Sequence, residues 1–118
     1  MVISPPEILR GDILLVDLEP TVGSEQMGTR PCIVVQNDFG NRTSPVTVVV
    51  PLTGAGKDKH YPFLGQIKKG DGGVKKDSYA LANQIRVIDK SKILKNLGHL
   101  SNTGIIEVER AIRDELDL

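Results

Sequence analysis

Residues 46–52 read VTVVVPL, the most β-branched run in the chain. Valine and threonine pack well on a pleated surface, so this run predicts a strand, and its β-branched, apolar character predicts a central one. Two earlier runs also predict strands: Gly11–Leu18 (GDILLVDL), which Pro20 ends, and residues 31–38 (PCIVVQND), where proline is tolerated at the first strand position. Between them and the central strand, residues 39–45 (FGNRTSP) have the composition of a turn.

The second half of the chain alternates short apolar runs with glycine-rich, lysine-bearing loops. Residues 61–67 (YPFLGQI) predict a short strand. Residues 78–89 (SYALANQIRVID) predict one or two strands with a break near Asn83. Asp89 is placed to cap a short helix over residues 90–96 (KSKILKN).

Only the C-terminus has sustained helical periodicity. Ile105, Val108, Ile112 and Leu116 fall on one helical face, and Ser101 is a suitable N-cap. Together with about five or six short strands joined by connections that suit antiparallel pairing, this helix predicts a mainly β fold: a small, partly closed antiparallel barrel with a C-terminal α-helix packed on it. The length of 118 residues, without repeats or linkers, predicts that residues 1–118 form a single domain.

The composition is that of an ordinary globular protein, with 39% hydrophobic and 25% charged residues. Aromatic residues are scarce and tryptophan is absent, which argues against a surface on which single-stranded nucleic acid stacks its bases. We find no signal peptide and no apolar run of membrane-spanning length, so we expect a cytoplasmic protein without a membrane partner.

The net charge is zero but unevenly distributed. Residues 1–53 carry three arginines and six acids (−3), residues 54–95 ten lysines and arginines and four acids (+6), and residues 96–118 two arginines and five acids (−3). Taken alone, a basic middle region favours an ordinary solvated surface. It is also compatible with a partner that carries phosphates.

The sequence offers few residues for metal or nucleophilic chemistry. His60 and His99 are far apart and have no ligand partner at a suitable spacing, so we expect no metal site. The single cysteine, Cys32, lies within an apolar run and predicts a small buried side chain rather than a nucleophile. The stretch TGAGKDKH at residues 53–60 lacks the spacing of a phosphate-binding P-loop, and no nucleophile elbow of a serine hydrolase is present.

Polar residues remain at the ends of two predicted strands. The loop GSEQMGTRP, residues 23–31, ends in Arg30 at the start of one strand, and Thr53 follows the central strand. If the strands are neighbours, both side chains emerge at the rim of the barrel, where a guanidinium and a hydroxyl can bind one phosphate. The alternative is structural: Arg30 pairs with Asp12 or Glu25, and Thr53 caps a turn. The spacing alone does not decide between them.

Three stretches, read together, resemble the MazF/PemK family of bacterial toxins. They are RGDILLVDLEPTVGSEQMGTRPCIVVQND (residues 10–38), NRTSPVTVVVPLT (residues 41–53) and DSYALANQIRVIDKSKI (residues 77–93). The resemblance implies a homodimer of SH3-like barrels that cleaves single-stranded RNA without a cofactor or metal. In this chemistry the 2′-hydroxyl of the RNA attacks the adjacent phosphate, leaving a cyclic phosphate and a 5′-hydroxyl.

By position, the resemblance implies that Arg30 stabilises the charge on the phosphorane and that Thr53 holds a phosphate oxygen. Glu25 matches a glutamate implicated in some members, either as general base or as a partner that neutralises Arg30 until RNA binds. The arginine and aspartate that some relatives use for acid–base work are replaced here by Leu81 and Asn83.

The remaining expectations concern binding. The polar loop would be a flap over an RNA groove, with Ser24 and Gln26 on the flap and Lys57 in a basic loop that follows the RNA backbone. Gln84 and Arg86 would position RNA or brace the dimer. The expected protein partner is a cognate, MazE-like antitoxin whose acidic, disordered segment covers the same groove. Two rivals are a gyrase poison of the same fold, disfavoured because such poisons rely on a tryptophan, and a degenerate module that binds RNA without cutting it.

Overall fold

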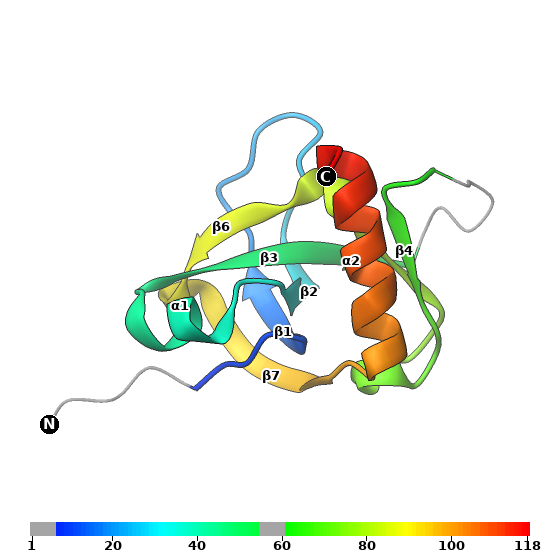
Figure 1. The fold of residues 1–118 in the computed structure, drawn as a ribbon. Coiled ribbons are helices and arrows are strands. Elements are labelled where there is room, and N and C mark those ends of the chain that lie inside the picture. The colour runs from blue at the N-terminus through cyan, green and yellow to red at the C-terminus, as the bar shows by residue number, and fades with distance from the viewer. Residues whose placement is uncertain (1–6, 55–60) are drawn as a thin grey trace, which may run out of the picture.

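A computed structural model of the chain describes residues 7–54 and 61–118. These residues form one antiparallel sheet of seven strands, two α-helices and three short 3-10 turns (Figure 1). The strands are β1 (Asp12–Asp17), β2 (Thr29–Val34), β3 (Val46–Thr53), β4 (Leu64–Ile67), β5 (Ser78–Leu81), β6 (Arg86–Asp89) and β7 (Ile93–His99). The helices are α1 (Asp38–Thr43) and α2 (Asn102–Leu116), and the 3-10 turns are η1 (Asp71–Gly73), η2 (Ala82–Gln84) and η3 (Lys90–Lys92).

Strand β3 is the centre of the sheet, as predicted. One of its edges pairs with β2, and the other pairs with β6 over its first half and with β5 at its end. The strand order is β4-β5-β3-β2-β1-β7, so β4 and β7 do not meet and the sheet is not closed. The prediction of a mainly β, partly closed antiparallel barrel with a C-terminal helix is confirmed.

Two hydrophobic clusters lie on the two faces of the sheet. The adjacent residues Val49 and Val50 belong to different clusters, because side chains alternate along a strand. Both faces of β3 are therefore buried, which explains its uninterrupted apolar sequence. One cluster contains Ile8, Leu14, Val16, Leu18, Cys32, Val34, Val49 and Ile88. The other contains Ile13, Ile33, Val50, Leu52, Ile67, Ala80, Leu100 and Val108.

Helix α2 crosses the sheet and covers the second of these clusters (Figure 1). Ser101 is its N-cap, as predicted, and accepts a hydrogen bond from the backbone N–H of Gly104 at 3.1 Å. Gly65 of β4 allows the close packing of α2, because a Cβ atom there would lie 3.3 Å from the carbonyl oxygen of Glu107. The helix thus seals the face that β4 and β5 leave open.

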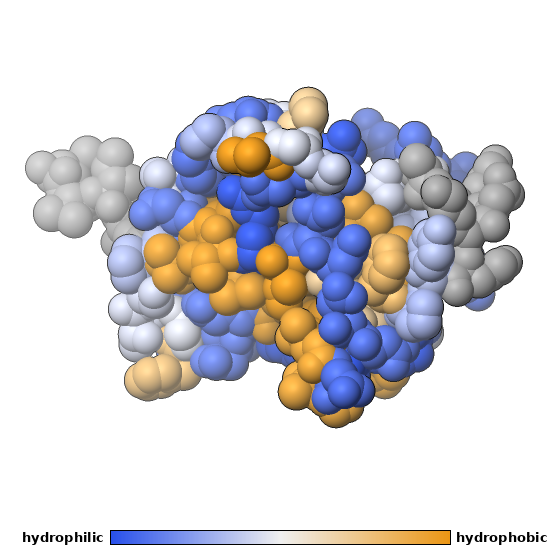
Figure 2. Space-filling model, turned by 90° about the horizontal axis from the view of Figure 1, so that it is seen from above, coloured by the Kyte–Doolittle hydropathy of each residue, from blue (hydrophilic) through white to orange (hydrophobic). Residues whose placement is uncertain are grey.

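Leu116 does not join the buried face of α2, contrary to the prediction, and is 49% exposed. The buried stripe of the helix runs through Gly104, Val108 and Ala111, and its next position is 115, so Leu116 is turned toward solvent. Other large hydrophobic side chains, Val22 and Val87 among them, are also exposed. Seen from above, the surface carries hydrophobic patches separated by hydrophilic residues (Figure 2).

Two local predictions were wrong. Residues 39–45, predicted as a turn, largely belong to α1, whose N-cap Asn37 accepts a hydrogen bond from the N–H of Gly40. Asn41 is buried in this helix and accepts a hydrogen bond from the Thr47 hydroxyl at 2.7 Å, so the helix depends on a tertiary contact with β3.

The predicted helix over residues 90–96 is reduced to the single turn η3. Asp89 does cap this turn, accepting a hydrogen bond from the N–H of Ser91 at 2.8 Å. From Ile93 onward the chain extends as β7 and pairs with β1. The free edge of β1 takes these backbone hydrogen bonds, which is why the sheet has seven strands rather than five or six.

The Arg10–Asp12 segment joins distant parts of the fold. The Arg10 guanidinium donates to the Val35 carbonyl at 3.1 Å and pairs with Glu109 of α2 at 2.9 Å. Asp12 is buried and accepts hydrogen bonds from the N–H of Leu9 and from the side chain of Asn96, and its carboxylate contacts His99 at 2.8 Å. These contacts are structural.

We expect Ser101→Ala to destabilise the fold by about 1 to 2 kcal/mol. The substitution removes the helix cap and also the 2.7 Å hydrogen bond from the Ser101 hydroxyl to Asp71 of η1. Urea denaturation measures the loss, with Thr103→Ala at an exposed position of the same helix as the control. Equal stability of the two variants would show that the cap contributes nothing.

Candidate active site

The pairing of β2 with β3 brings the two strand-end residues together. In the antiparallel register Cys32 lies opposite Pro51 and Ile33 opposite Val50. Extending this register to the strand ends sets Arg30 opposite Thr53. Opposed residues of an antiparallel pair share a face, with Cβ atoms about 4.5–5.5 Å apart. Both residues are half-buried, as expected at the rim of a barrel.

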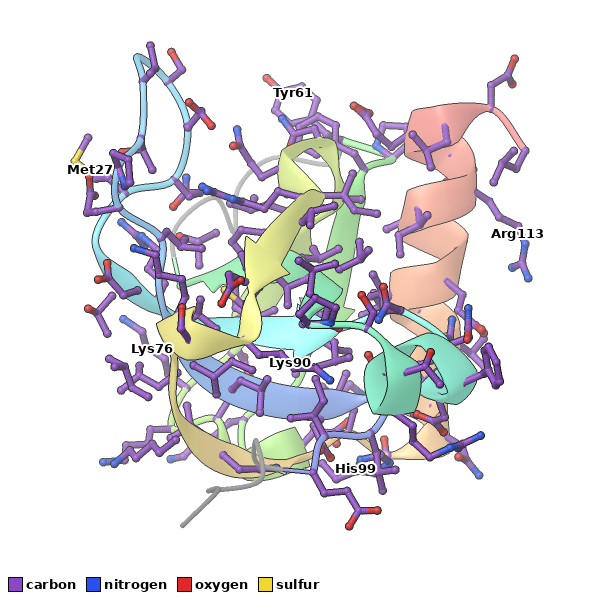
Figure 3. All side chains as sticks on the ribbon, turned by 90° about the vertical axis from the view of Figure 1, so that its left-hand side faces the viewer. Met27, Tyr61, Lys76, Lys90, His99 and Arg113 are labelled. Carbon is purple, nitrogen blue, oxygen red and sulfur yellow. The ribbon has the colours of Figure 1, made fainter. Side chains whose placement is uncertain are left out.

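The guanidinium of Arg30 is held by a backbone carbonyl in the loop before β2. Its Nε donates to the Met27 carbonyl at 2.9 Å. Met27 itself projects outward from the flap, residues 18–28, which connects β1 and β2 (Figure 3). Within residues 7–54 and 61–118, the two Nη atoms of Arg30 have no hydrogen-bond partner. The guanidinium is therefore fixed at one nitrogen and open at the other two.

The alternative in which Arg30 pairs with Asp12 or Glu25 is not observed among the described residues. The carboxylate of Asp12 is engaged with β7 and the segment before β1. Glu25 is exposed, and its Oε1 accepts a hydrogen bond from the N–H of Val22 at 2.7 Å. Neither carboxylate forms an ion pair with Arg30 among these residues. Glu25 is thus held within its own loop rather than on the guanidinium.

Gln84 fastens the flap to the sheet. Its Oε1 accepts a hydrogen bond from the N–H of Gln26 at 3.3 Å, and its Nε2 lies 3.5 Å from the carbonyl oxygen of Ser24 as a donor. The structure therefore brings Ser24, Gln26 and Gln84 together, through the backbone of the flap rather than through its side chains. Lys57 lies outside the described residues.

Arg86 adds a second positive charge on the side of Arg30. It lies on β6 opposite Val49, on the same sheet face as Cys32. Its Nη1 is buried and has no partner within the described part of the chain. A buried donor without a partner is costly, so this group calls for an explanation, and a water, an ion or another molecule would supply the missing acceptor.

Cys32 lies between these arginines and is chemically inert. Burial raises the pKa of its thiol to about 12, although the positive charges of Arg86 and Arg30 act in the opposite direction. Its Sγ donates to the Arg30 carbonyl at 3.6 Å. The prediction of a small buried side chain is confirmed. The position of Arg86 on the face of Cys32 was missed, because β6 reaches this face only through its pairing with β3.

Neither a metal site nor a membrane-spanning helix is found among the described residues. Their histidine, cysteine and acidic side chains form no group of three or more that could hold a metal ion. No helix in residues 7–54 and 61–118 is long and apolar enough to cross a membrane.

The raised pKa of Cys32 predicts a specific pH dependence of stability. Between pH 9.0, the ordinary thiol value, and about 12, the unfolded chain loses the thiol proton while the folded chain keeps it. The free energy of unfolding should therefore fall as pH rises, by up to about 1.4 kcal/mol per pH unit from this group. The Cys32→Val variant should lack this part of the slope. Urea denaturation from pH 8 to pH 10 compares the two proteins, and parallel curves would contradict the shielding of the thiol.

Comparisons with known proteins identify the relatives of this chain. The model of the PemK-like, MazF-like toxins of type II toxin–antitoxin systems matches residues 9–116. The endoribonuclease MazF of Staphylococcus saprophyticus is 41% identical over 109 residues, which cover 92% of this chain and 91% of that protein.

Solved structures have the same fold. MazF of Deinococcus radiodurans gives a TM-score of 0.82 at 23% identity, over 96% of this chain and 99% of that one. An endoribonuclease in complex with its cognate antitoxin, from mycobacterial species, gives a TM-score of 0.79 at 23% identity, over 94% and 96% of the two chains. The resemblance seen in the sequence is confirmed: the chain belongs to the family of PemK-like, MazF-like toxins of type II toxin–antitoxin systems.

Proposed function

We propose that this chain is an endoribonuclease toxin that cleaves single-stranded RNA within short sequence motifs, without a metal ion, and so inhibits translation and growth. Membership of the family supports the activity. The observation that carries the site is the register of β2 and β3, which sets Arg30 opposite Thr53.

The proposed reaction is a transesterification within the RNA. The 2′-oxygen attacks the adjacent phosphorus and the bond to the 5′-oxygen breaks, leaving a 2′,3′-cyclic phosphate and a 5′-hydroxyl. The open Nη atoms of Arg30 would donate to the non-bridging oxygens, whose negative charge grows in the transition state, and the Thr53 hydroxyl would hold the same phosphate. Because Nε is already bound to Met27, the guanidinium needs little reorganisation.

The 2′-hydroxyl proton needs a base, and Glu25 is our candidate. Its exposed position on the flap allows it to meet an RNA strand beneath. To act, its carboxylate would have to leave the N–H of Val22. The alternative role of Glu25, neutralising Arg30 before RNA binds, has no support in the ion pairs of the described residues.

The proposed RNA contacts surround this centre. Ser24, Gln26 and Gln84 line the junction of flap and sheet, and Arg86 brings a charge whose buried Nη1 has no partner among the described residues. Lys57 is also proposed to contact RNA, as a prediction from the sequence alone.

The proposal extends to partners. The basic region 54–95, with a balance of +6, suits the acidic segment of a cognate antitoxin as well as RNA. One solved relative is a complex with its cognate antitoxin. We propose that residues 1–118 form one toxin domain, that two copies form a homodimer, and that the protein acts in the cytoplasm.

Arg30→Ala and Thr53→Ala should each lower the cleavage rate of a long single-stranded RNA about 100-fold or more, since each removes a donor to the charge that develops on the phosphate. The measurement is cleavage in the presence of EDTA, with the 5′ ends mapped for hydroxyl groups at a recurrent motif.

Arg113→Ala is the matched control, because Arg113 is an exposed arginine in the last turn of α2. It should cleave like the wild type. Full activity of Arg30→Ala would place the site elsewhere, and no cleavage of any RNA by folded, antitoxin-free wild type would overturn the enzyme proposal.

Gln84→Ala should release the flap. Amide hydrogen exchange at residues 24–26 should become at least several-fold faster, because the variant loses both flap contacts of the amide side chain. Asn83→Ala, an exposed neighbour, should leave exchange unchanged. If the two variants exchange equally, Gln84 does not hold the flap.

A further inference from the structure

The peptide unit between Met27 and Gly28 is held at both of its polar ends. Its carbonyl oxygen accepts the hydrogen bond from Nε of Arg30 at 2.9 Å. Its N–H, on Gly28, donates to Oε2 of Glu19. A peptide unit is planar, with its C=O and N–H on opposite sides, so fixing the N–H also fixes the direction of the carbonyl. One rigid group therefore links Glu19 to Arg30, although the two form no ion pair with each other within residues 7–54 and 61–118.

Glu19 is itself fixed at the start of the flap, two residues after the end of β1. Its N–H donates to Oδ1 of Asp17 at 3.0 Å, and its carbonyl accepts from Nζ of Lys92 at 2.8 Å. Its carboxylate also accepts from the hydroxyl of Thr21 at 3.2 Å. Because both its backbone and its side chain have partners, the carboxylate is a preformed acceptor for the N–H of Gly28.

Gly28 completes the link between the two ends of the flap. Its carbonyl accepts from the N–H of Leu18 at 3.0 Å, so both polar groups of its backbone bind residues that follow β1. Its φ is +77°, which residues with a side chain rarely adopt, and a Cβ there would meet nothing within 4 Å. The glycine thus serves the direction of the backbone rather than close packing, and it sets how the Met27–Gly28 peptide faces the start of β2.

We propose that Glu19 is a positioning residue for the cleavage reaction: it holds the Met27–Gly28 peptide so that the Met27 carbonyl orients the guanidinium of Arg30. This inference rests on the proposed function, in which the Nη atoms of Arg30 bind the phosphate. A carboxylate that accepts from a peptide N–H polarises the peptide, which strengthens the carbonyl as an acceptor. A carboxylate bound directly to the Nη atoms would compete with the phosphate. Acting through the peptide, Glu19 orients the guanidinium and leaves these atoms to the RNA.

Cleavage kinetics test the positioning role. Glu19→Ala should lower kcat on a single-stranded RNA about ten-fold and change KM by less than about two-fold, because the donors to the phosphate remain but lose their orientation. Glu19→Gln should keep kcat within about three-fold of the wild type, since its amide oxygen still accepts from the Gly28 N–H. Glu7→Ala, which removes an exposed carboxylate before β1, is the matched control and should cleave like the wild type. Equal losses in Glu19→Ala and Glu19→Gln would assign Glu19 to proton transfer and overturn the proposal.

Hydrogen exchange of arginine side chains tests the orientation without RNA. At mildly acidic pH, the Nε–H of Arg30 should exchange with solvent at least several-fold faster in Glu19→Ala than in the wild type or Glu19→Gln. The Nε–H of Arg10, which donates to the Val35 carbonyl at 3.1 Å, is the internal reference and should keep its rate. Thermal unfolding checks that each variant is folded. If the Arg30 Nε–H of the wild type exchanged as fast as that of free arginine, the proposal would fail whatever the variants do.

Failure of this proposal and failure of the proposed function give different results. Faster exchange of the Arg30 Nε–H in Glu19→Ala, in a protein that cuts no RNA, would overturn the proposed function and leave the link from Glu19 to Arg30 standing. An unchanged kcat in a folded Glu19→Ala variant that cuts RNA would overturn the positioning role alone.

Discussion

The pairing of β2 with β3 is the constraint on which the rest of the structure depends. Residues on both faces of this pair are buried, Cys32 and Val49 on one side and Ile33 and Val50 on the other. A slip of one residue would exchange the two hydrophobic clusters, so the register is strongly determined. The same register sets Arg30 opposite Thr53. The geometry of the proposed site is therefore a consequence of core packing, and the loops around it need only present RNA to it.

The positive charges of Arg30 and Arg86 are a second feature of the proposed site. Arg30 and Arg86 both act on the thiol of Cys32, so two cationic groups lie on the same face of the sheet. Among residues 7–54 and 61–118, the Nη atoms of Arg30 and the buried Nη1 of Arg86 have no hydrogen-bond partner, and a polyanion could supply one. Both RNA and an acidic antitoxin segment meet this requirement. The two would then compete for one surface.

The sequence predicted the parts of the fold that depend on local pattern. A few neighbouring residues are enough to recognise the β-branched run of β3, the apolar run of β1 and the capped helical periodicity of α2. It failed at α1 and β7, whose conformations depend on partners distant in sequence: Thr47 for the buried Asn41, and the free edge of β1 for residues 93–99. Arg30 and Thr53 were proposed as site residues because the ends of the two strands can be recognised in the sequence. The approach of Arg86 to Cys32, the turn of Glu25 toward Val22 and the contact of Glu19 with Gly28 required the tertiary structure.

The most direct test of the account is a double-mutant cycle on RNA cleavage with Arg30→Ala, Thr53→Ala and the double variant. If the two side chains hold one phosphate, as their opposed positions require, the loss of activation free energy in the double variant should be clearly smaller than the sum of the two single losses. Strictly additive losses would mean that the residues act independently. The pairing of β2 with β3 would then not be what assembles the active site.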